Sequence, residues 1–241
     1  MPVLSPEVNT ILFDLDGTLR ISRPSGEDIF LDFVAGLGAP DDEGTRRAAR
    51  QWAHRYWASS GEMKEDVKNF SGDEEAFWLN YALRKIEAMG VADGSAVAWA
   101  EQASQHMLES YEPEDVIPAD VVPTLNALKA AGFKVGLLTN RSRPVGAYLE
   151  ESGLDQHLDF WVYSGMLNVW KPDPEIFFYT LGMAGSVPEK SVYIGDNYFA
   201  DVVGARRAKI QPVLIDPERI FPEADCPVIN SIGELSELLG I

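Results

Sequence analysis

From about residue 118 onward, short apolar runs alternate with segments of helical periodicity. This rhythm is typical of a parallel sheet, because each helix carries the chain back to the end of the sheet where the next strand begins. A doubly wound, Rossmann-like α/β fold is therefore the expected core. Strands are predicted at 134–139, 160–164, 191–195 and 212–215, and helices at 121–131, 144–152, 174–183, 201–208 and 232–239.

A further strand is predicted near the amino terminus, where the apolar run 10–13 leads into Asp14, Asp16 and Gly17. A short apolar run bounded by a turn signal is typical of a buried strand. The Asp16-Gly17 pair alone is equally typical of an ordinary turn. The full pattern Asp-x-Asp-Gly-Thr is rare by chance, however, and the ends of parallel strands are where α/β proteins bind ligands. We therefore interpret both acids as candidates for a functional site.

The stretch 24–116 shows helical periodicity repeatedly and almost no strand signal. Four amphipathic helices predict a small bundle, inserted just after the first strand. Both linkers then emerge beside the two acids, so we expect the bundle to act as a lid. The predicted division is an α/β core from 1–20 and 117–241 and a helical cap from 21–116. The four apolar faces lie within 29–37, 49–56, 76–86 and 97–108.

The composition limits the partners of this chain. Its 241 residues carry a formal net charge of −18, which opposes nonspecific binding to nucleic acid or to anionic membrane surfaces. No apolar run approaches membrane-spanning length, and residues 1–9 lack the basic cluster of a targeting segment. The single cysteine, Cys226, is expected to be a packing residue. The default expectation is a cytoplasmic protein that binds neither nucleic acid nor membranes.

Polar residues that could take part in a reaction follow several predicted strands. Parallel strands bring such segments to one edge of a sheet, although they lie far apart in the sequence. Four such segments are Asp14-Leu15-Asp16-Gly17-Thr18, Leu137-Leu138-Thr139-Asn140, Lys171-Pro172-Asp173-Pro174 and Gly195-Asp196-Asn197-Tyr198-Phe199-Ala200-Asp201. In this order they resemble the four motifs of the haloacid dehalogenase superfamily, in the phosphoglycolate phosphatase-like subgroup whose α-helical cap lies between the first and second motifs.

These residue types suit phosphoryl transfer, which needs a nucleophile, charge cancellation and a proton for the leaving oxygen. Asp14 is the candidate nucleophile, because a carboxylate can attack phosphorus and form a phospho-aspartate. Asp16 is the candidate general acid and base. Lys171, Thr139 and Asn140 are expected to bind the phosphate group. In isolation, Thr139 could simply end a strand and Lys171 could simply lie on the surface; their order and spacing favour the functional interpretation.

An anionic nucleophile that approaches a phosphate is repelled, so a divalent cation is expected. The resemblance implies Mg²⁺, bound by Asp14, the backbone carbonyl of Asp16, and Asp196, with Asp201 supporting the site. A simple alternative is that Asp196 and Asp201 cap the following helix, because acids suit helix N-termini. The Gly-Asp pair directly after an apolar strand favours the metal role.

The second acid, Asp16, bears on the choice of reaction. Dehalogenating relatives lack this acid and the magnesium site, so its presence favours phosphate chemistry. The predicted function is a Mg²⁺-dependent phosphomonoester hydrolase that acts on a small phosphorylated metabolite. A phosphomutase would keep both acids and stays an alternative. A noncatalytic metabolite-sensing or interaction protein is a further alternative, against which the presence of Asp14, Asp16, Lys171 and Asp196 argues.

Two arginines lie in the segment that leads into the cap, Arg20 and Arg23. They are candidates to bind a second anionic group of the substrate. Salt bridges within this very acidic protein are an alternative of equal weight.

Within the cap, Arg46, Arg50 and His54 recur at four-residue spacing and share one helix face. A solvated face is favoured over a lid surface that meets an acidic substrate. Three tryptophans are expected to fill the core of the bundle: Trp52, Trp57 and Trp78.

Overall fold

The computed structural model describes residue 4, residues 7–91 and residues 94–241. Positions 1–3, 5–6 and 92–93, which belong to the predicted core and cap segments, lie outside the described residues. The chain divides into two compact units. We call Met1–Ile21 together with Val116–Ile241 the core unit, and Ser22–Asp115 the cap unit.

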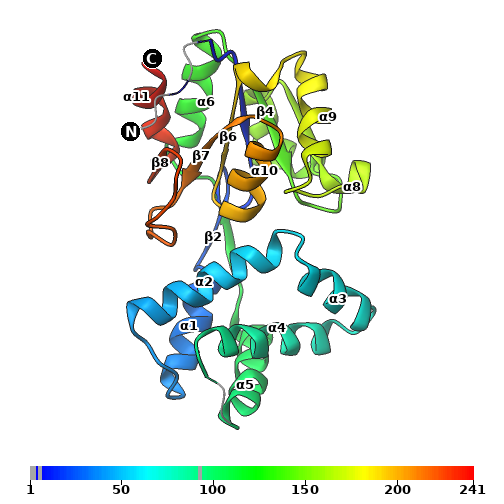
Figure 1. The fold of residues 1–241 in the computed structure, drawn as a ribbon, viewed down its shortest axis with the longest axis vertical. Helices are drawn as coiled ribbons and strands as arrows, with labels where there is room; N and C mark the ends of the chain where they lie inside the picture. Colours follow the sequence, from blue (N-terminus) through cyan, green and yellow to red (C-terminus); the bar gives the residue numbers. More distant parts are fainter. Residues whose placement is uncertain (1–3, 5–6, 92–93) are drawn as a thin grey trace. The chain divides into compact units, whose positions relative to one another are not determined.

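The core unit contains a six-stranded sheet in the order β5-β4-β1-β6-β7-β8, and its neighbouring strands all run parallel (Figure 1). The predicted doubly wound parallel fold is therefore confirmed. Strand β8 has no counterpart among the predicted strands, because two residues are too few to show a period. The strands are β1 (Thr10–Phe13), β4 (Lys134–Thr139), β5 (Phe160–Tyr163), β6 (Ser191–Gly195), β7 (Gln211–Ile215) and β8 (Val228–Ile229).

Both faces of the sheet are covered by helices. Successive residues of β1 point to opposite faces, so that Ile11 and Phe13 pack with α6, α7 and α11, whereas Leu12 packs with α9 and α10. The strand ends are therefore the accessible part of the sheet. The helices are α6 (Val121–Ala130), α7 (Gly146–Ser152), α8 (Ser164–Leu167), α9 (Pro174–Ala184), α10 (Val203–Arg207) and α11 (Leu235–Leu239), with short 3₁₀ turns at Leu154–His157, Pro188–Lys190 and Ile232–Glu234.

The helix predicted at 201–208 begins earlier, with a π-helical turn at Tyr198–Val202 that leads into α10. Asn197 caps this turn, because its Oδ1 accepts hydrogen bonds from the backbone N–H groups of Phe199 and Ala200, both at 3.0 Å. Asp201 consequently lies inside the turn, and its Oδ2 accepts a hydrogen bond from the backbone N–H of Asn197 at 2.9 Å. Turns of this kind are frequent at functional sites.

The cap unit is helical, as the periodicity of the sequence predicts. Its described residues form one helix more than the four predicted. The sequence pattern misses α3 because this helix lacks an apolar stripe: its Val67 is exposed. The linkers on either side of the cap, β2 (Ile21–Arg23) and β3 (Glu114–Val116), form a two-stranded sheet (Figure 1). The cap helices are α1 (Gly26–Gly36), α2 (Glu43–Trp57), α3 (Gly61–Asn69), α4 (Glu74–Ala88) and α5 (Ser95–Ser110).

Polar contacts, rather than apolar packing, hold α3 in place. Asp66 is buried, and its carboxylate accepts hydrogen bonds from Tyr56 Oη at 3.1 Å and from Arg84 Nη2 at 3.0 Å. The buried face of α5 matches the apolar face predicted within 97–108 only in part: Ala100 is buried as predicted, whereas Val97 and Leu108 are exposed.

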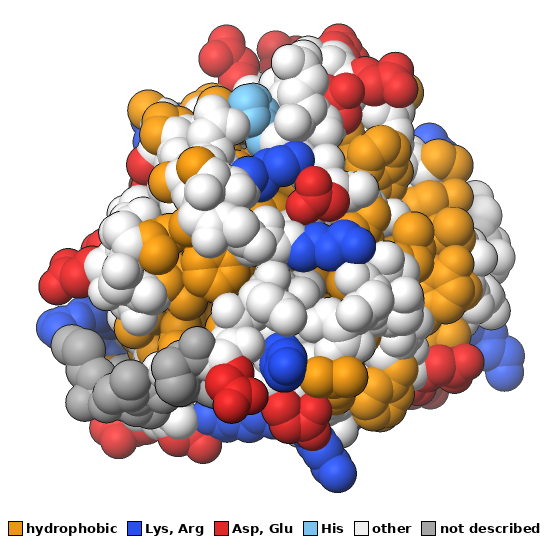
Figure 2. Space-filling model, turned by 90° about the horizontal axis from the view of Figure 1, so that it is seen from above, with side chains coloured by type: hydrophobic (Ala, Val, Ile, Leu, Met, Phe, Trp, Pro, Cys, Tyr) orange, Lys and Arg blue, Asp and Glu red, His pale blue; other side chains and the backbone are white. Residues whose placement is uncertain are grey.

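The face of the molecule in Figure 2 mixes residue types. Lys and Arg side chains are interspersed there with acidic and hydrophobic ones. In the part of the chain that the structure describes, no helix is both long enough and apolar enough to span a membrane.

Replacing Asp66 by alanine removes the acceptor that Tyr56 and Arg84 share. Because the Arg84 side chain is one-third exposed and can be rehydrated, we expect the free energy of unfolding of the cap to fall by about 2 kcal/mol. Denaturant unfolding followed by tryptophan fluorescence measures this change. Glu65→Ala, which removes an exposed acid of the same helix, is the matched control. Equal losses from the two variants would contradict the role of Asp66.

Candidate active site

The sheet topology places Asp14 at the centre of the site. Phe13, the last residue of β1, is paired with Leu137 of β4 on one side and with Ile194 of β6 on the other. The chain extends the sheet from β1 through β4 to β5, and then returns to add β6, β7 and β8 on the other side. The strand order therefore reverses between β1 and β6, and open α/β sheets bind ligands at such a switch point. Asp14 and Asp196 follow these two strands directly.

The turn after Asp14 depends on Gly17. This residue has a φ of +83°, and a Cβ added to it would lie 2.3 Å from Asp196 Oδ2. Its N–H donates to the backbone oxygen of Arg20 at 2.7 Å, which closes the turn. The neighbouring Thr18 donates from Oγ1 to Asp196 Oδ1 at 3.0 Å. This geometry explains the residue types at positions 17 and 18. Only glycine leaves room for the Asp196 carboxylate, and the threonine hydroxyl then orients that carboxylate.

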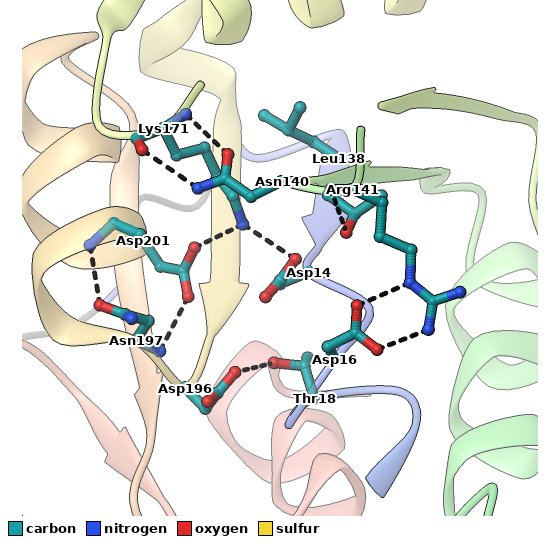
Figure 3. A network of polar contacts seen from close by, with 12 residues as sticks. Asp14, Asp16, Thr18, Leu138, Asn140, Arg141, Lys171, Asp196, Asn197 and Asp201 are labelled. Atoms are coloured by element: carbon teal, nitrogen blue, oxygen red, sulfur yellow. Dashed lines mark hydrogen bonds and ion pairs between the residues drawn. The ribbon is translucent and has the colours of Figure 1, made fainter. Parts of the chain in front are cut away.

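Lys171 connects the acidic residues (Figure 3). Its Nζ lies 2.8 Å from Asp14 Oδ1 and 2.7 Å from Asp201 Oδ1. It also donates a hydrogen bond to Tyr193 Oη at 2.8 Å, and Tyr193 in turn donates to the backbone oxygen of Leu138 at 2.8 Å. The sequence analysis did not single out Tyr193, because within an apolar strand a tyrosine is indistinguishable from a core residue.

The side chain of Asn140 holds the Lys171 backbone. Its Oδ1 accepts from the Lys171 N–H at 2.8 Å, and its Nδ2 donates to the Lys171 carbonyl at 3.1 Å. Ser164 donates to the same Oδ1 at 3.0 Å. The Asn140 amide, predicted to bind phosphate, is thus used to position Lys171. Thr139 is buried at the end of β4, and its Oγ1 accepts a 3.4 Å hydrogen bond from the Arg141 N–H.

Burial and neighbouring charges shift the pKa values of the ionisable residues in this site. Burial raises the pKa of Asp14 to about 7, an effect that Lys171 reduces and Asp201 increases. Burial, with the nearby charge of Asp14, raises the pKa of Asp196 to about 7. Burial also raises the pKa of Asp201, against the effect of Lys171. For Lys171 itself, burial lowers the pKa, but the charges of Asp14 and Asp201 outweigh burial and raise it.

These residues fit a divalent cation. Asp14, Asp196 and Asp201 each offer one carboxylate oxygen, and the three oxygens lie within 4.8 Å of one another. Two buried carboxylates, those of Asp14 and Asp201, and the partly buried one of Asp196 face a single ammonium, so an additional positive charge stabilises their ionised forms. All-oxygen donors suit a hard cation. Because both oxygens of Asp201 already contact Lys171 and Asn197, Asp14 and Asp196 are the better side-chain ligands.

Asp16 lies beside this cluster and contacts two arginines, Arg20 and Arg141, of which Figure 3 shows Arg141. Arg141 donates from Nε to Oδ2 at 2.8 Å and from Nη2 to Oδ1 at 2.7 Å. Arg20 donates from Nη1 to Oδ1 at 3.0 Å. Arg20 was a candidate for substrate contact, and the structure places its guanidinium on Asp16. Arg23, the other candidate, is an exposed residue of the cap unit. Sequence reasoning missed Arg141, whose only signal is a positive charge directly after the second motif.

Two expectations about the cap need correction. The arginine stripe of α2 is not a freely solvated face, because Arg50 pairs with Asp28 of α1 at 2.5 Å and Arg46 pairs with Asp32 at 2.7 Å. The tryptophans do not all fill the core. Trp57 and Trp78 are 38% and 41% exposed and line a cavity of about 340 Å³ within the cap unit. Aromatic rings tolerate this position because their apolar bodies stay packed while one edge meets water.

Comparison with known proteins decides the family. The sequence model of the haloacid dehalogenase-like hydrolases matches residues 8–209. The chain belongs to the haloacid dehalogenase-like hydrolases. Its resemblance to this superfamily, inferred from the four motifs, is confirmed, and membership makes the chain a hydrolase.

Similar proteins cover nearly the whole chain. Pyrophosphatase PpaX from Bacillus cereus (strain AH820) is 30% identical over 98% of this chain and 96% of its own length. Ribulose-1,5-bisphosphate 5-phosphatase from Halopiger xanaduensis is 26% identical over 95% of this chain and 98% of its own. A solved dehalogenase structure with an intermediate complex has a TM-score of 0.60 and 21% identity, covering 99% of this chain and 100% of that one, which shows the fold alone.

The raised pKa values predict how stability depends on pH in metal-free protein. Asp14 and Asp196 have pKa values of about 7 in the folded state, against an ordinary value of 3.8. Between these values the folded state binds more protons than the unfolded state, so the free energy of unfolding falls as the pH rises. We expect the melting temperature in chelator to fall from pH 5 to pH 8.

Asp196→Asn should flatten this pH dependence, because it removes one titrating carboxyl and its repulsion of the other. Asp225→Asn, which removes a surface carboxyl of the core unit, is the control and should leave the slope unchanged. Thermal unfolding of the three proteins across this range gives the comparison. A slope that is the same in Asp196→Asn as in the unmodified protein would contradict the assignment.

Proposed function

We propose that this chain is a Mg²⁺-dependent phosphomonoester hydrolase that works through a phospho-aspartate on Asp14. The observation that carries the proposal is the convergence of Asp14, Lys171, Asp196 and Asp201 at the switch point of the sheet. The names of two relatives support phosphate chemistry, since one is a pyrophosphatase, and the other, a ribulose-1,5-bisphosphate 5-phosphatase, acts on a phosphate ester.

The reaction needs two displacements at phosphorus. In the first, a carboxylate oxygen of Asp14 forms a bond to phosphorus while the ester bond breaks, and the leaving oxygen takes a proton from Asp16. In the second, water attacks the phosphorus of the aspartyl phosphate and gives a proton to Asp16. Inorganic phosphate leaves, and both carboxyl groups return to their starting states.

The remaining residues position groups and balance charge. The Lys171 ammonium, 2.8 Å from Asp14 Oδ1, orients the nucleophile and offers a positive charge to the phosphate. Asp201 and Asn140 fix Lys171 from its two ends. Asp14, the backbone carbonyl of Asp16, and Asp196 would hold Mg²⁺. When bound, the ion supplies positive charge that offsets the repulsion between Asp14 and the phosphate.

The proposed substrates are small phosphorylated metabolites. The cap unit is proposed to act as a lid that limits substrate size and excludes bulk water. A cytoplasmic location and the lack of nucleic-acid partners stay predictions from the sequence.

Asp14→Asn tests the nucleophile. An amide lacks the charge needed to attack phosphorus, so we expect kcat for 4-nitrophenyl phosphate to fall by about 10³ or more. Phosphate release is measured with Mg²⁺ at saturating substrate. Asp225→Asn is the matched control and should keep its activity. Full turnover by Asp14→Asn would show that another group attacks phosphorus. Interconversion of sugar phosphates in excess of phosphate release would identify a mutase instead.

Metal removal tests the cation. Chelator should abolish phosphate release, and added Mg²⁺ should restore it. Asp196→Asn should raise the Mg²⁺ concentration needed for half-maximal activity by about 10 to 100-fold, because it removes one of the two side-chain ligands. Activity that persists in chelator would contradict the proposed chemistry.

A further inference from the structure

The contacts of Asp16 conflict with the role proposed for it. Both of its oxygens accept hydrogen bonds from guanidinium groups: Oδ2 from Arg141, and Oδ1 from Arg141 and Arg20. A carboxyl group that donates a proton to a leaving oxygen must point its own protonated oxygen toward the substrate. Asp16 therefore has to give up at least one of its contacts with Arg141 before it can act as the acid.

The guanidinium that Asp16 leaves behind needs another partner. The Arg141 side chain is 28% exposed, so water replaces a lost anion only in part. The centroid of the Tyr148 ring lies 4.7 Å from the guanidinium carbon of Arg141, and this contact also fixes the position of the Arg141 side chain. The two parallel N–H groups of Arg141 match the geometry of a carboxylate or a phosphate. An anion that takes the place of Asp16 would restore both hydrogen bonds.

We propose that Arg141, together with Arg20, forms an anion subsite that Asp16 occupies until a second anionic group of the substrate replaces it. The inference rests on the proposed phosphomonoester hydrolase and names its substrate class. That class is small phosphomonoesters with a carboxylate or a second phosphate near the ester oxygen. Arg141 is then a specificity-determining residue, and it acts on the proton transfer through Asp16.

The distances limit where the second anion can be. Asp16 is two residues from Asp14 and touches Arg141 directly. The group that replaces it must therefore lie within a few bonds of the ester oxygen that Asp16 protonates. One anion replaces another at Arg141, so the charge there is conserved while Asp16 is released. In a chain with a net charge of −18, two arginines on one carboxylate form a local site that an anionic substrate can enter.

The test compares two substrates that differ only in the second anion, 2-phosphoglycolate and 2-hydroxyethyl phosphate. We expect the unmodified protein to prefer 2-phosphoglycolate in kcat/KM by at least about tenfold. Arg141→Gln should abolish this preference, and Arg141→Lys, which keeps the charge but not the fork, should restore it in part. Arg143→Gln, a change of the same kind at an exposed arginine of the same loop, should retain the full preference.

A binding measurement accompanies the kinetics. Phosphonoacetate should raise the melting temperature of the unmodified protein more than 2-hydroxyethylphosphonate does, and Arg141→Gln should remove the difference. If Arg141→Gln lowers kcat/KM equally for both substrates, Arg141 only supports the structure and the inference is overturned. If the unmodified protein hydrolyses neither substrate, the proposed function fails on these compounds, and the melting data alone decide whether the anion subsite exists.

Discussion

A buried ammonium group holds the acidic cluster of this protein together. Lys171 lies between Asp14 and Asp201, which come from opposite ends of the sequence and carry raised pKa values. Removing one partner from a buried ion pair typically costs about 3 to 5 kcal/mol, because it leaves an uncompensated charge. Asn140 and Tyr193 surround Lys171 with hydrogen bonds, so the loop that carries it, the end of β4 and the strand β6 all meet at this one group.

Much of the core unit is predictable from the sequence. The strands at 134–139 and 191–195 have the predicted limits, because each contains a short, mainly apolar run that begins after a polar residue and ends at a polar residue or a glycine. Parallel pairing then brings together the residues that follow β1 and β6 without further information. The contacts among those residues are not predictable in the same way. An arginine in a loop and a tyrosine in a strand are ordinary in any protein. Only the folded geometry shows that Arg141 contacts Asp16 and that Tyr193 contacts Lys171.

The cap unit shows where periodicity fails as a guide. A helix held by a buried carboxylate, as α3 is by Asp66, carries no apolar stripe for the pattern to reveal. In α5 the close packing of small residues leaves larger ones such as Leu108 exposed. Trp57 and Trp78 line a cavity because the bundle does not close over them. In each case tertiary packing decides which side chains are buried, and the local sequence pattern does not carry that information.

The covalent intermediate on Asp14 is the central claim, and trapping it is the most direct test. The protein is mixed with 4-nitrophenyl phosphate and Mg²⁺, quenched in acid during turnover, and reduced with borohydride, which converts an aspartyl phosphate to homoserine. Tandem mass spectrometry then reads the peptide that contains Asp14 and Asp16. The account predicts homoserine at position 14 alone, and only when substrate is present. Rapid phosphate release with an unmodified Asp14, or with homoserine at another position, would contradict it.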